Sequence, residues 1–291
     1  MRILLIRTIL SPSSATAQLA VSVSRRGLLA LLLAVSVCLG LPAHAQVRSL
    51  AAIQDSGTLR VGVNPNFPPM SSYGMTNQLE GFDVDIARRI AEQLKVKLRL
   101  VPTAAQHRVT FLSSGRIDLA LGALTETPAR AELIDFSVPL HTEAMSVLTT
   151  DRLQIESWRE LNTPEITLVN MRGNLSVELL KERLPKAKTL LVDGNADTVR
   201  ALAQGRADAL VENIDLFLKF TETYRNVEWR RLDDVLYVAH CGIGMAQGNA
   251  ELKQFLDSLL RELHASGYVN ERWEHWFGAP MTVPVEAQAT S

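Results

Sequence analysis

From residue 57 onward the sequence alternates between two hydrophobic periods, and this alternation constrains the fold more than any other feature. Residues 59–63 form a short apolar strand-like run, and apolar residues then recur at helical spacing over 82–94. Strands that alternate with helices pack as parallel βαβ units, so the chain is expected to be an α/β protein. Further strands are predicted at 96–101, 117–121, 166–170, 189–192, 207–211 and 237–245, and further helices near 109–113, from 127, and at 176–183, 198–204, 213–224 and 251–266.

Several helix boundaries are marked by the residues that favour them. Gly81 permits the turn into the helix over 82–94, and Asp83 and Asp85 place negative charge near its positive end. Asn195 or Asp197 is expected to cap the helix over 198–204.

The composition excludes several classes of protein. Hydrophobic residues make up 47% and charged residues 21% of the 291 residues, which excludes a disordered or collagen-like chain. Lys and Arg together number 30 against 31 Asp and Glu, so no basic field attracts nucleic acid or an anionic membrane surface.

The first 45 residues have the composition of an export signal. They contain four arginines and no acidic residue, and the apolar run over 27–41 is too short to span a bilayer comfortably. The small-x-small pattern over 43–45 predicts removal of the signal after Ala45, which places the mature protein in the periplasm. Residues 24–29 resemble a twin-arginine signal, but two arginines before an apolar run also suit the Sec route, and both routes stay open.

The two cysteines give the mature chain no internal disulfide. Cys38 lies in the signal, and Val37 before it is bulkier than a lipoprotein site prefers. Cys241 is then the one thiol of the mature chain. Its neighbour His240 is expected to point to the opposite face of a strand, so Cys241 is interpreted as a buried structural thiol.

The common catalytic and metal-binding motifs are absent. The sequence has no HExxH, GxSxG, GxxxxGK[ST] or CxxC, and its six histidines lack the spacing of metal ligands. The patterns therefore predict no catalytic residue, no metal and no cofactor, and a protein that is not an enzyme.

A series of short runs makes the sequence similar to a known family. These runs resemble the periplasmic polar amino-acid binding proteins of ABC importers, known as solute-binding protein family 3. They are LRVGVNPNFPPM at 59–70, GFDVDIA at 81–87, SGRIDL at 114–119, TPAR at 127–130, DFSVP at 135–139, QGRADA at 204–209 and WEHWFG at 273–278.

The resemblance implies a type II periplasmic binding protein with two α/β lobes, joined by two crossover strands that form a hinge. Lobe one would comprise residues 50–142 and 241–280, lobe two residues 143–240, and residues 281–291 a flexible tail. The ligand would be held in a cleft that closes by hinge motion. The implied partners are a small carboxylate ligand and an ABC permease with its ATPase at the inner membrane, with the binding protein acting as a monomer.

The resemblance also assigns roles to residues of the cleft. Arg130 matches the arginine that grips the ligand α-carboxylate, for which a guanidinium offers two parallel hydrogen bonds. Thr125 and the backbone of Ala123 match positions that bind the α-amino group or the carboxylate, and Phe67 matches an aromatic that covers the ligand. Without the resemblance, these would be a surface arginine, a strand-end residue and a core aromatic. The turn in lobe two contributes Asn174 and Leu175, and Leu175 lacks the usual hydroxyl.

Three further positions bear on the class of ligand. Arg108, in the run QHRV, matches an arginine of glutamate and aspartate binders, which favours an acidic ligand; a solvated arginine is the alternative. Asn213 stands where family members carry an Asp for the ligand ammonium, and Asn64 where binders of basic amino acids often have Asp. Glu212 would replace that Asp only if the strand register shifted, because adjacent strand residues face opposite ways.

The expected function is capture of a small carboxylate, foremost a polar or acidic amino acid, for import by an ABC transporter. Asn213 motivates an alternative ligand that lacks the amine, such as a dicarboxylate or keto acid. A sensory binding protein is a further alternative. The enzyme alternative is a cyclohexadienyl or arogenate dehydratase, and the run MRGNL at 171–175 departs from the Asn-Pro-Gly-Gly-Thr-like run of that class.

Overall fold

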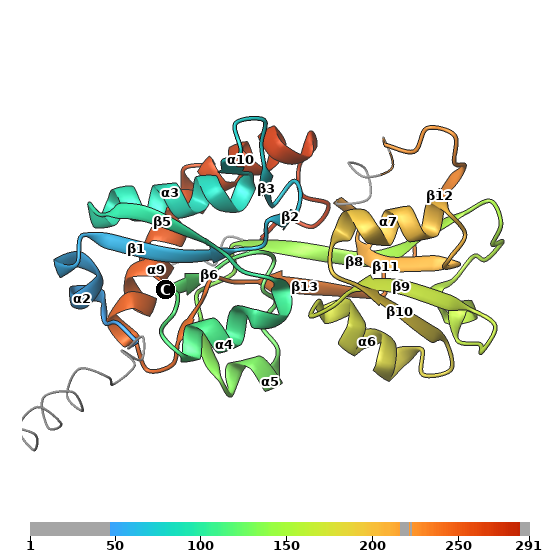
Figure 1. Cartoon of the computed structure of the whole chain (residues 1–291), viewed down its shortest axis with the longest axis horizontal. Helices are drawn as coiled ribbons and strands as arrows, with labels where there is room; N and C mark the ends of the chain where they lie inside the picture. Colours follow the sequence, from blue (N-terminus) through green and yellow to red (C-terminus); the bar gives the residue numbers. More distant parts are fainter. Residues whose placement is uncertain (1–46, 216–220, 222, 286–291) are drawn as a thin grey trace, which may run out of the picture. The chain divides into compact units, whose positions relative to one another are not determined.

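The computed structural model describes residues 47–215, 221 and 223–285 (Figure 1). The predicted signal peptide over 1–45, with Cys38, lies outside the described residues. Among the described residues, no helix combines the length and the apolar character that a membrane span requires.

The first sheet is five-stranded and mixed, with the order β5-β1-β6-β14-β7. β1 pairs in parallel with β5 and with β6, whereas β14 is antiparallel to β6 and to β7. The parallel pairs are those expected from strands that alternate with helices. The strands are β1 (Thr58–Val63), β5 (Lys97–Pro102), β6 (Leu119–Ala120), β7 (Ile134–Phe136) and β14 (Gly244–Ala246).

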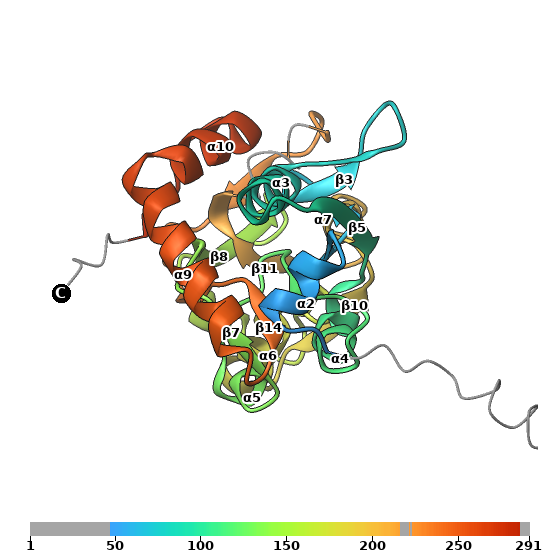
Figure 2. The ribbon, with the colours of Figure 1, turned by 90° about the vertical axis from the view of Figure 1, so that its left-hand side faces the viewer.

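Helices cover both faces of this sheet because successive strand residues point to opposite sides. Leu119 packs in one apolar cluster with the helices α3, α9 and α10, and its neighbour Ala120 packs in another with α4 (Figures 1 and 2). The helices of this lobe are α2 (Leu50–Asp55), α3 (Phe82–Leu94), α4 (Arg108–Ser113), α5 (Pro128–Ala131), α9 (Ala250–Ala265) and α10 (Tyr268–Phe277), with a 3₁₀ turn η1 (Ala105–His107).

The second sheet has the order β10-β9-β11-β8-β12, and β13 pairs with the other end of β8. β9 is parallel to β10 and to β11, whereas β8 is antiparallel to β11, β12 and β13. Its strands are β8 (His141–Thr150), β9 (Thr167–Met171), β10 (Lys188–Val192), β11 (Ala209–Asn213), β12 (Trp229–Arg231) and β13 (Tyr237–Cys241).

The second sheet is also covered on both faces. Val147 packs in the apolar cluster that holds α6, and its neighbour Leu148 packs in the cluster that holds α7. Those helices of this lobe whose bounds fall within the described residues are α6 (Leu175–Arg183) and α7 (Asn195–Ala203), with a 3₁₀ turn η2 (Trp158–Leu161). The prediction of an α/β fold is confirmed. The expected lobe bounds, 50–142 with 241–280 and 143–240, stay a prediction, although the strands of the two sheets divide between 58–136 with 244–246 and 141–241.

Strand and helix bounds differ from the expectation at several points. The run over 237–245 is two strands, β13 and β14, which belong to different sheets. Gly194 is the N-cap of α7, so the helix begins at Asn195 rather than after Asp197. Residues 209–213 form β11, so the helix expected over 213–224 does not begin at Asn213; residues 214, 215 and 221 are helical, and 216–220 and 222 lie outside the described residues. A third small sheet comprises β2 (Asn66–Phe67), β3 (Ser71–Tyr73) and β4 (Leu79–Glu80).

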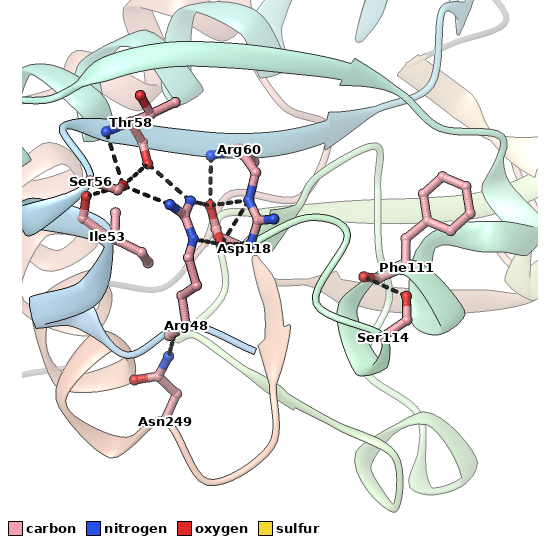
Figure 3. A network of polar contacts seen from close by, with 9 residues as sticks. All are labelled: Arg48, Ile53, Ser56, Thr58, Arg60, Phe111, Ser114, Asp118 and Asn249. Atoms are coloured by element: carbon pink, nitrogen blue, oxygen red, sulfur yellow. Dashed lines mark hydrogen bonds and ion pairs between the residues drawn. The ribbon is translucent and has the colours of Figure 1, made fainter. Parts of the chain in front are cut away.

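Asp118 holds the start of the first lobe together (Figure 3). Its side chain is 1% exposed and accepts hydrogen bonds from Arg60 Nη2 at 2.6 Å and from Arg48 Nε at 2.9 Å. Burial alone raises the pKa of Asp118, but the bonds from both arginines and from the Arg60 peptide N–H outweigh it and lower the pKa overall. The segment before β1 is thereby fixed to the loop before β6.

The structure differs from the expected flexible tail at its first residues. Met281 is buried in the core of the first lobe, and the Thr282 hydroxyl and peptide N–H donate to Asp215. The Val283 carbonyl accepts a hydrogen bond from Thr142 Oγ1. These docking contacts need no repeating hydrophobic pattern, which is why the sequence gives no sign of them. Residues 286–291 lie outside the described part of the chain.

Candidate functional site

Arg130 lies in α5 and joins the two lobes. Thr127 caps this short helix by accepting a hydrogen bond from the Arg130 peptide N–H, and Pro128 occupies the first helical position. The guanidinium donates from Nη1 to the Thr125 carbonyl at 3.0 Å and from Nη2 to the Gly173 carbonyl of the second lobe at 3.3 Å. Nη2 also lies 3.3 Å from Oε1 of the exposed Glu178. The guanidinium is therefore held at the junction by carbonyl oxygens from both lobes.

The turn between β9 and α6 meets the first lobe at the same place. Gly173 has φ +83°, and a Cβ there would lie 2.8 Å from the Gln106 peptide nitrogen. Only glycine combines this conformation with so close an approach of two backbones. The turn is therefore shaped for contact with the 105–108 segment.

Asn174 and Leu175, the next two residues of the turn, point in different directions. Asn174 is the N-cap of α6, but its side chain makes no capping bond and instead donates from Nδ2 to Oε2 of Glu212 at 2.7 Å. Leu175 packs in the core of the second lobe. Of the two predicted site residues, Asn174 is the one whose polar group is aimed at other candidate residues.

Glu212 and Asn213 end β11, where Glu212 is paired with Ser146 and Asn213 with Met145. Burial raises the pKa of Glu212 to about 7, although the Asn174 amide and the Asn213 peptide N–H oppose the rise. Asn213 Oδ1 accepts from the Asp215 peptide N–H at 3.2 Å, and within the described part of the chain its Nδ2 has no partner. Glu212 reaches Asn174 in this register, without the shift that the sequence argument required.

Arg108 is fully buried beside the junction. Its Nε donates to the Ala105 carbonyl at 3.1 Å, and its Nη1 donates to the Gly122 carbonyl. Burial and then the charge of Arg130 lower the pKa of Arg108 to about 10. Ala123, the next predicted residue, has a left-handed φ of +51°. The positive charges of the two arginines therefore influence each other. The Nε and Nη1 groups of Arg108, however, donate to carbonyl groups of its own lobe.

Thr125 and Glu143 lie around Cys241, where β8 begins and β13 ends. Thr125 Oγ1 is 3.6 Å from Cys241 Sγ, and both residues are buried. Burial, followed by the charge of Glu212, raises the pKa of Glu143 to about 8. The polar surroundings of Thr125 therefore include a thiol and a carboxyl group that the sequence did not connect with it.

Asn64 and Phe67 follow β1, and the structure separates their environments. Asn64 Nδ2 donates to Sδ of Met171 at 3.7 Å, which makes it another contact between the lobes. Phe67 is 1% exposed and packs in the core of the first lobe, as a core aromatic would.

Seven of the nine predicted site residues divide into two groups. Arg130, Thr125 and Asn174 converge at the junction, with Arg108 and Asn64 beside it, whereas Phe67 and Leu175 face apolar cores. Glu143 also belongs to this group but was not predicted, because a single Glu in a buried strand matches no sequence motif. Glu212 could be noticed from its position beside Asn213, but not its contact with Asn174.

The chain matches one family model over most of its length. Residues 59–279 match bacterial extracellular solute-binding proteins, family 3. The chain belongs to this family. Membership confirms the resemblance noted from the short runs, and the family places the molecule among extracellular proteins that bind solutes.

Relatives of known function include binding proteins and one enzyme. The chain is 24% identical to the cyclohexadienyl dehydratase of Pseudomonas aeruginosa, over 82% of this chain and 91% of that protein. It is 25% identical to the ABC transporter glutamine-binding protein GlnH of Bacillus subtilis (78% and 84%) and 26% identical to the L-cystine-binding protein TcyJ of Escherichia coli (80% and 87%).

Solved structures of amino-acid-binding proteins share the fold. The ancestral amino acid-binding protein AncCDT-1, a precursor of cyclohexadienyl dehydratase, superposes with a TM-score of 0.73 at 30% identity, covering 78% of this chain and 99% of that one. The solute receptor for L-cysteine of Neisseria gonorrhoeae gives a TM-score of 0.74 at 27% identity, covering 82% and 98%. The expectation of a two-lobed type II periplasmic binding protein is confirmed.

Proposed function

We propose that this family 3 protein captures a small α-amino acid between its lobes, with Arg130 binding the α-carboxylate. The observation that carries the proposal is the position of the Arg130 guanidinium, which donates to carbonyl groups of both lobes. A ligand carboxylate that replaces one of these neutral acceptors gains charge-assisted and bidentate hydrogen bonds. Because the guanidinium contacts both lobes, its ligand would hold them together.

Glu212 would supply the negative charge for the ligand ammonium. It is buried and lies at the junction through its bond to Asn174. An ammonium beside it would favour the ionised carboxylate and so offset the effect of burial, which raises its pKa. Asn213 offers no such charge. This arrangement favours an amino acid over the amine-free dicarboxylate or keto acid that Asn213 alone suggests.

Arg108 favours a polar or acidic side chain on the ligand. Its positive charge lies within the electrostatic reach of Arg130, so the junction carries two guanidinium groups. Arg108 is fully buried and Arg130 is partly buried, and electrostatic interactions are stronger in such surroundings than in water. A second carboxylate or an amide would be stabilised there, whereas a cationic side chain would be repelled.

The setting we propose for this binding is the periplasm. After export and removal of residues 1–45, the liganded monomer would be recognised by an ABC permease with its ATPase. A sensory role would use the same binding site and a different membrane partner. Ligand capture is therefore tested first, because both roles depend on it.

A second candidate function is a dehydratase, and a specific observation favours keeping it. Glu143 and Glu212 both have a raised pKa, about 8 and about 7, so either can carry a proton near neutral pH. A general acid with such a pKa suits the loss of water from a bound substrate. The cyclohexadienyl dehydratase of Pseudomonas aeruginosa is one relative of this chain.

The test is a binding series on protein that has been unfolded and refolded to remove carried-over ligand. Melting temperature and calorimetric titration are measured with L-Glu, L-Asp, L-Gln, L-Arg, glutarate and 2-oxoglutarate. A ligand at about 100 times its dissociation constant stabilises the folded state by about 2.7 kcal/mol. We expect stabilisation by polar or acidic amino acids, and a 10- to 100-fold loss of affinity, by order of magnitude, in Arg130→Met.

Matched variants separate the alternatives. Arg172→Met removes an exposed arginine that pairs with Asp193 and should leave affinity unchanged. Glu212→Gln should weaken amino acids but not amine-free acids, whereas a ligand set of amine-free acids alone would refute the role of Glu212. Turnover of arogenate by the wild type, abolished in Glu143→Gln, would establish the dehydratase in place of a pure binding protein.

A further inference from the structure

Three buried side chains, His141, Glu143 and Cys241, converge where β8 begins and β13 ends. His141 and Glu143 are two residues apart in β8 and therefore point to the same face. Cys241 in β13 is directly paired with His141 across the strands. One ligand atom from each of the three buried side chains lies within 4.8 Å of the other two. Strand pairing thus joins residues that are 100 positions apart, a spacing that no sequence motif covers.

Glu143 is incompletely hydrogen-bonded at this point. The residue is 3% exposed, and among the described residues its Oε1 has no hydrogen-bond partner. A buried polar atom without a partner costs roughly 1–3 kcal/mol, so native structures usually satisfy such atoms with a protein group, a water or an ion. The orphaned oxygen belongs to the same cluster as a thiol and an imidazole, both of which are metal ligands.

His141 is oriented by its surroundings in the manner of a ligand. Its Nδ1 lies 3.2 Å from the Thr142 carbonyl, and donation from Nδ1 leaves Nε2 as the nitrogen with a free lone pair. The ring contacts Phe82 and Trp273, with ring centroids 5.9 Å and 5.1 Å away. A backbone carbonyl that fixes the tautomer is the usual outer partner of a metal-bound histidine.

The charges around the cluster include more acids than bases. Arg108 is a cation close enough to influence both Glu143 and Cys241, while the carboxyl groups of Glu212 and Asp215 lie close enough to raise the pKa of Glu143. On the other side His264 faces His141, and burial lowers its pKa. A divalent cation bound at the cluster would favour the ionised forms of these buried carboxyl groups.

We propose that His141, Glu143 and Cys241 form a binding site for a divalent transition-metal ion, and the donor set points to Zn²⁺. Sulfur, imidazole nitrogen and carboxylate oxygen are the three ligand types of zinc, at about 2.0–2.3 Å. Ligand atoms around such an ion are about 3.5 Å apart, so small side-chain rotations suffice. Three protein ligands leave a fourth position open, and the ion would link β8 to β13 beside Thr125. This inference is independent of which ligand the lobes capture.

The experiment uses the full chain, expressed without a histidine tag and dialysed against a chelator. Co²⁺ replaces Zn²⁺ as a spectroscopic probe, since a thiolate ligand gives a sulfur-to-cobalt charge-transfer band in the near ultraviolet. We expect one Co²⁺ per chain, displacement by Zn²⁺, and loss of the band in Cys241→Ser. Glu143→Gln, which keeps the side-chain shape, should weaken Zn²⁺ binding at least 100-fold by order of magnitude, because even outer partners cost 10- to 100-fold.

His240→Asn is the matched control. His240 is the exposed strand neighbour of Cys241, so this variant should bind like the wild type. Absence of the charge-transfer band in the wild type would overturn the proposal. So would a band that persists in Cys241→Ser, or an equal loss of binding in His240→Asn. Circular dichroism confirms folding of each variant, and if one variant fails to fold, the other variant and the wild-type spectrum decide the outcome.

Discussion

Asp83 provides a test of how burial shapes the stability of this fold. It lies in the first turn of α3 and is completely buried, and neither carboxylate oxygen has a hydrogen-bond partner in the described structure. Burial raises its pKa from an ordinary 3.8 to about 7, although the nearby Gly122 peptide N–H, which falls short of hydrogen-bond geometry, and the Arg108 charge oppose the rise. The substitution that tests this effect is Asp83→Asn, which keeps the shape of the side chain and removes its ionisable proton.

The sign and size of the effect follow from linkage. Below pH 4, Asp83 is protonated in both the folded and the unfolded chain, so ionisation contributes nothing to stability. Between pH 4 and about 7 only the unfolded chain loses the proton, and stability falls as pH rises. At 1.36 kcal/mol per pKa unit, the rise from 3.8 to about 7 amounts to about 4 kcal/mol above pH 7.

The assay is urea denaturation of wild type and Asp83→Asn at pH 5, 6, 7 and 8. The variant should gain stability relative to wild type as pH rises, with most of the gain between pH 5 and 7. Comparison with wild type cancels the titration of the other buried acids. Asp85→Asn, on the same helix turn, removes an acceptor of Arg88 and Trp276 and should instead be destabilising at pH 8. A difference between Asp83→Asn and wild type that does not change with pH would refute the reasoning.

Two further substitutions test how the first lobe is held together, each measured by urea denaturation. Asp118→Asn should cost about 3 kcal/mol, because two partly buried arginines lose their shared carboxylate; a cost below 1 kcal/mol would contradict that role. Gly81→Ala should cost at least about 2 kcal/mol, because φ is +136° and the new Cβ would lie 2.3 Å from the Met70 carbonyl oxygen. Gly57→Ala is its control, since φ is +62° with nothing within 4 Å, and equal costs for the two would disprove the steric argument.

The hydrophobic periods predict the regular part of the fold well. The helix expected over 82–94 is α3, and the strands expected over 96–101 and 166–170 match β5 and β9 within one residue. In each case at least one face of the element is buried or half-buried, so the pattern of apolar residues reflects the packing directly.

Elements with other roles leave no such record. β8 is the longest strand in the described part of the chain, yet it was not predicted, because its ten residues are all buried and six of them are polar. A strand that lines a junction on one side and a core on the other has no clean alternation. The helix α10 was also missed, since it buries few residues and two of the three are aromatic.

The position of a charged residue in the sequence likewise does not show whether the fold buries it, as Asp83 illustrates. The sequence places Asp83 at the positive end of a helix, where a carboxylate is stabilising near solvent. The fold buries the group completely, and the cost of desolvation exceeds the benefit of the helix dipole. Only the tertiary structure shows which of these two effects is larger.

The candidate site shows what a motif can and cannot transfer. Arg130 was found because its run, TPAR, fixes both the helix start and the side chain that follows. The acid at the junction was sought at position 213, where the motif has it, and Asn213 suggested a ligand without an amine. The bond between Asn174 and Glu212 supplies a carboxyl group one residue earlier, because a long side chain at the end of β11 can reach a site that strand alternation alone would deny it. In the proposed site the carboxyl group has therefore moved one residue along the strand, and the proposed choice between an amino acid and an amine-free acid depends on Glu212.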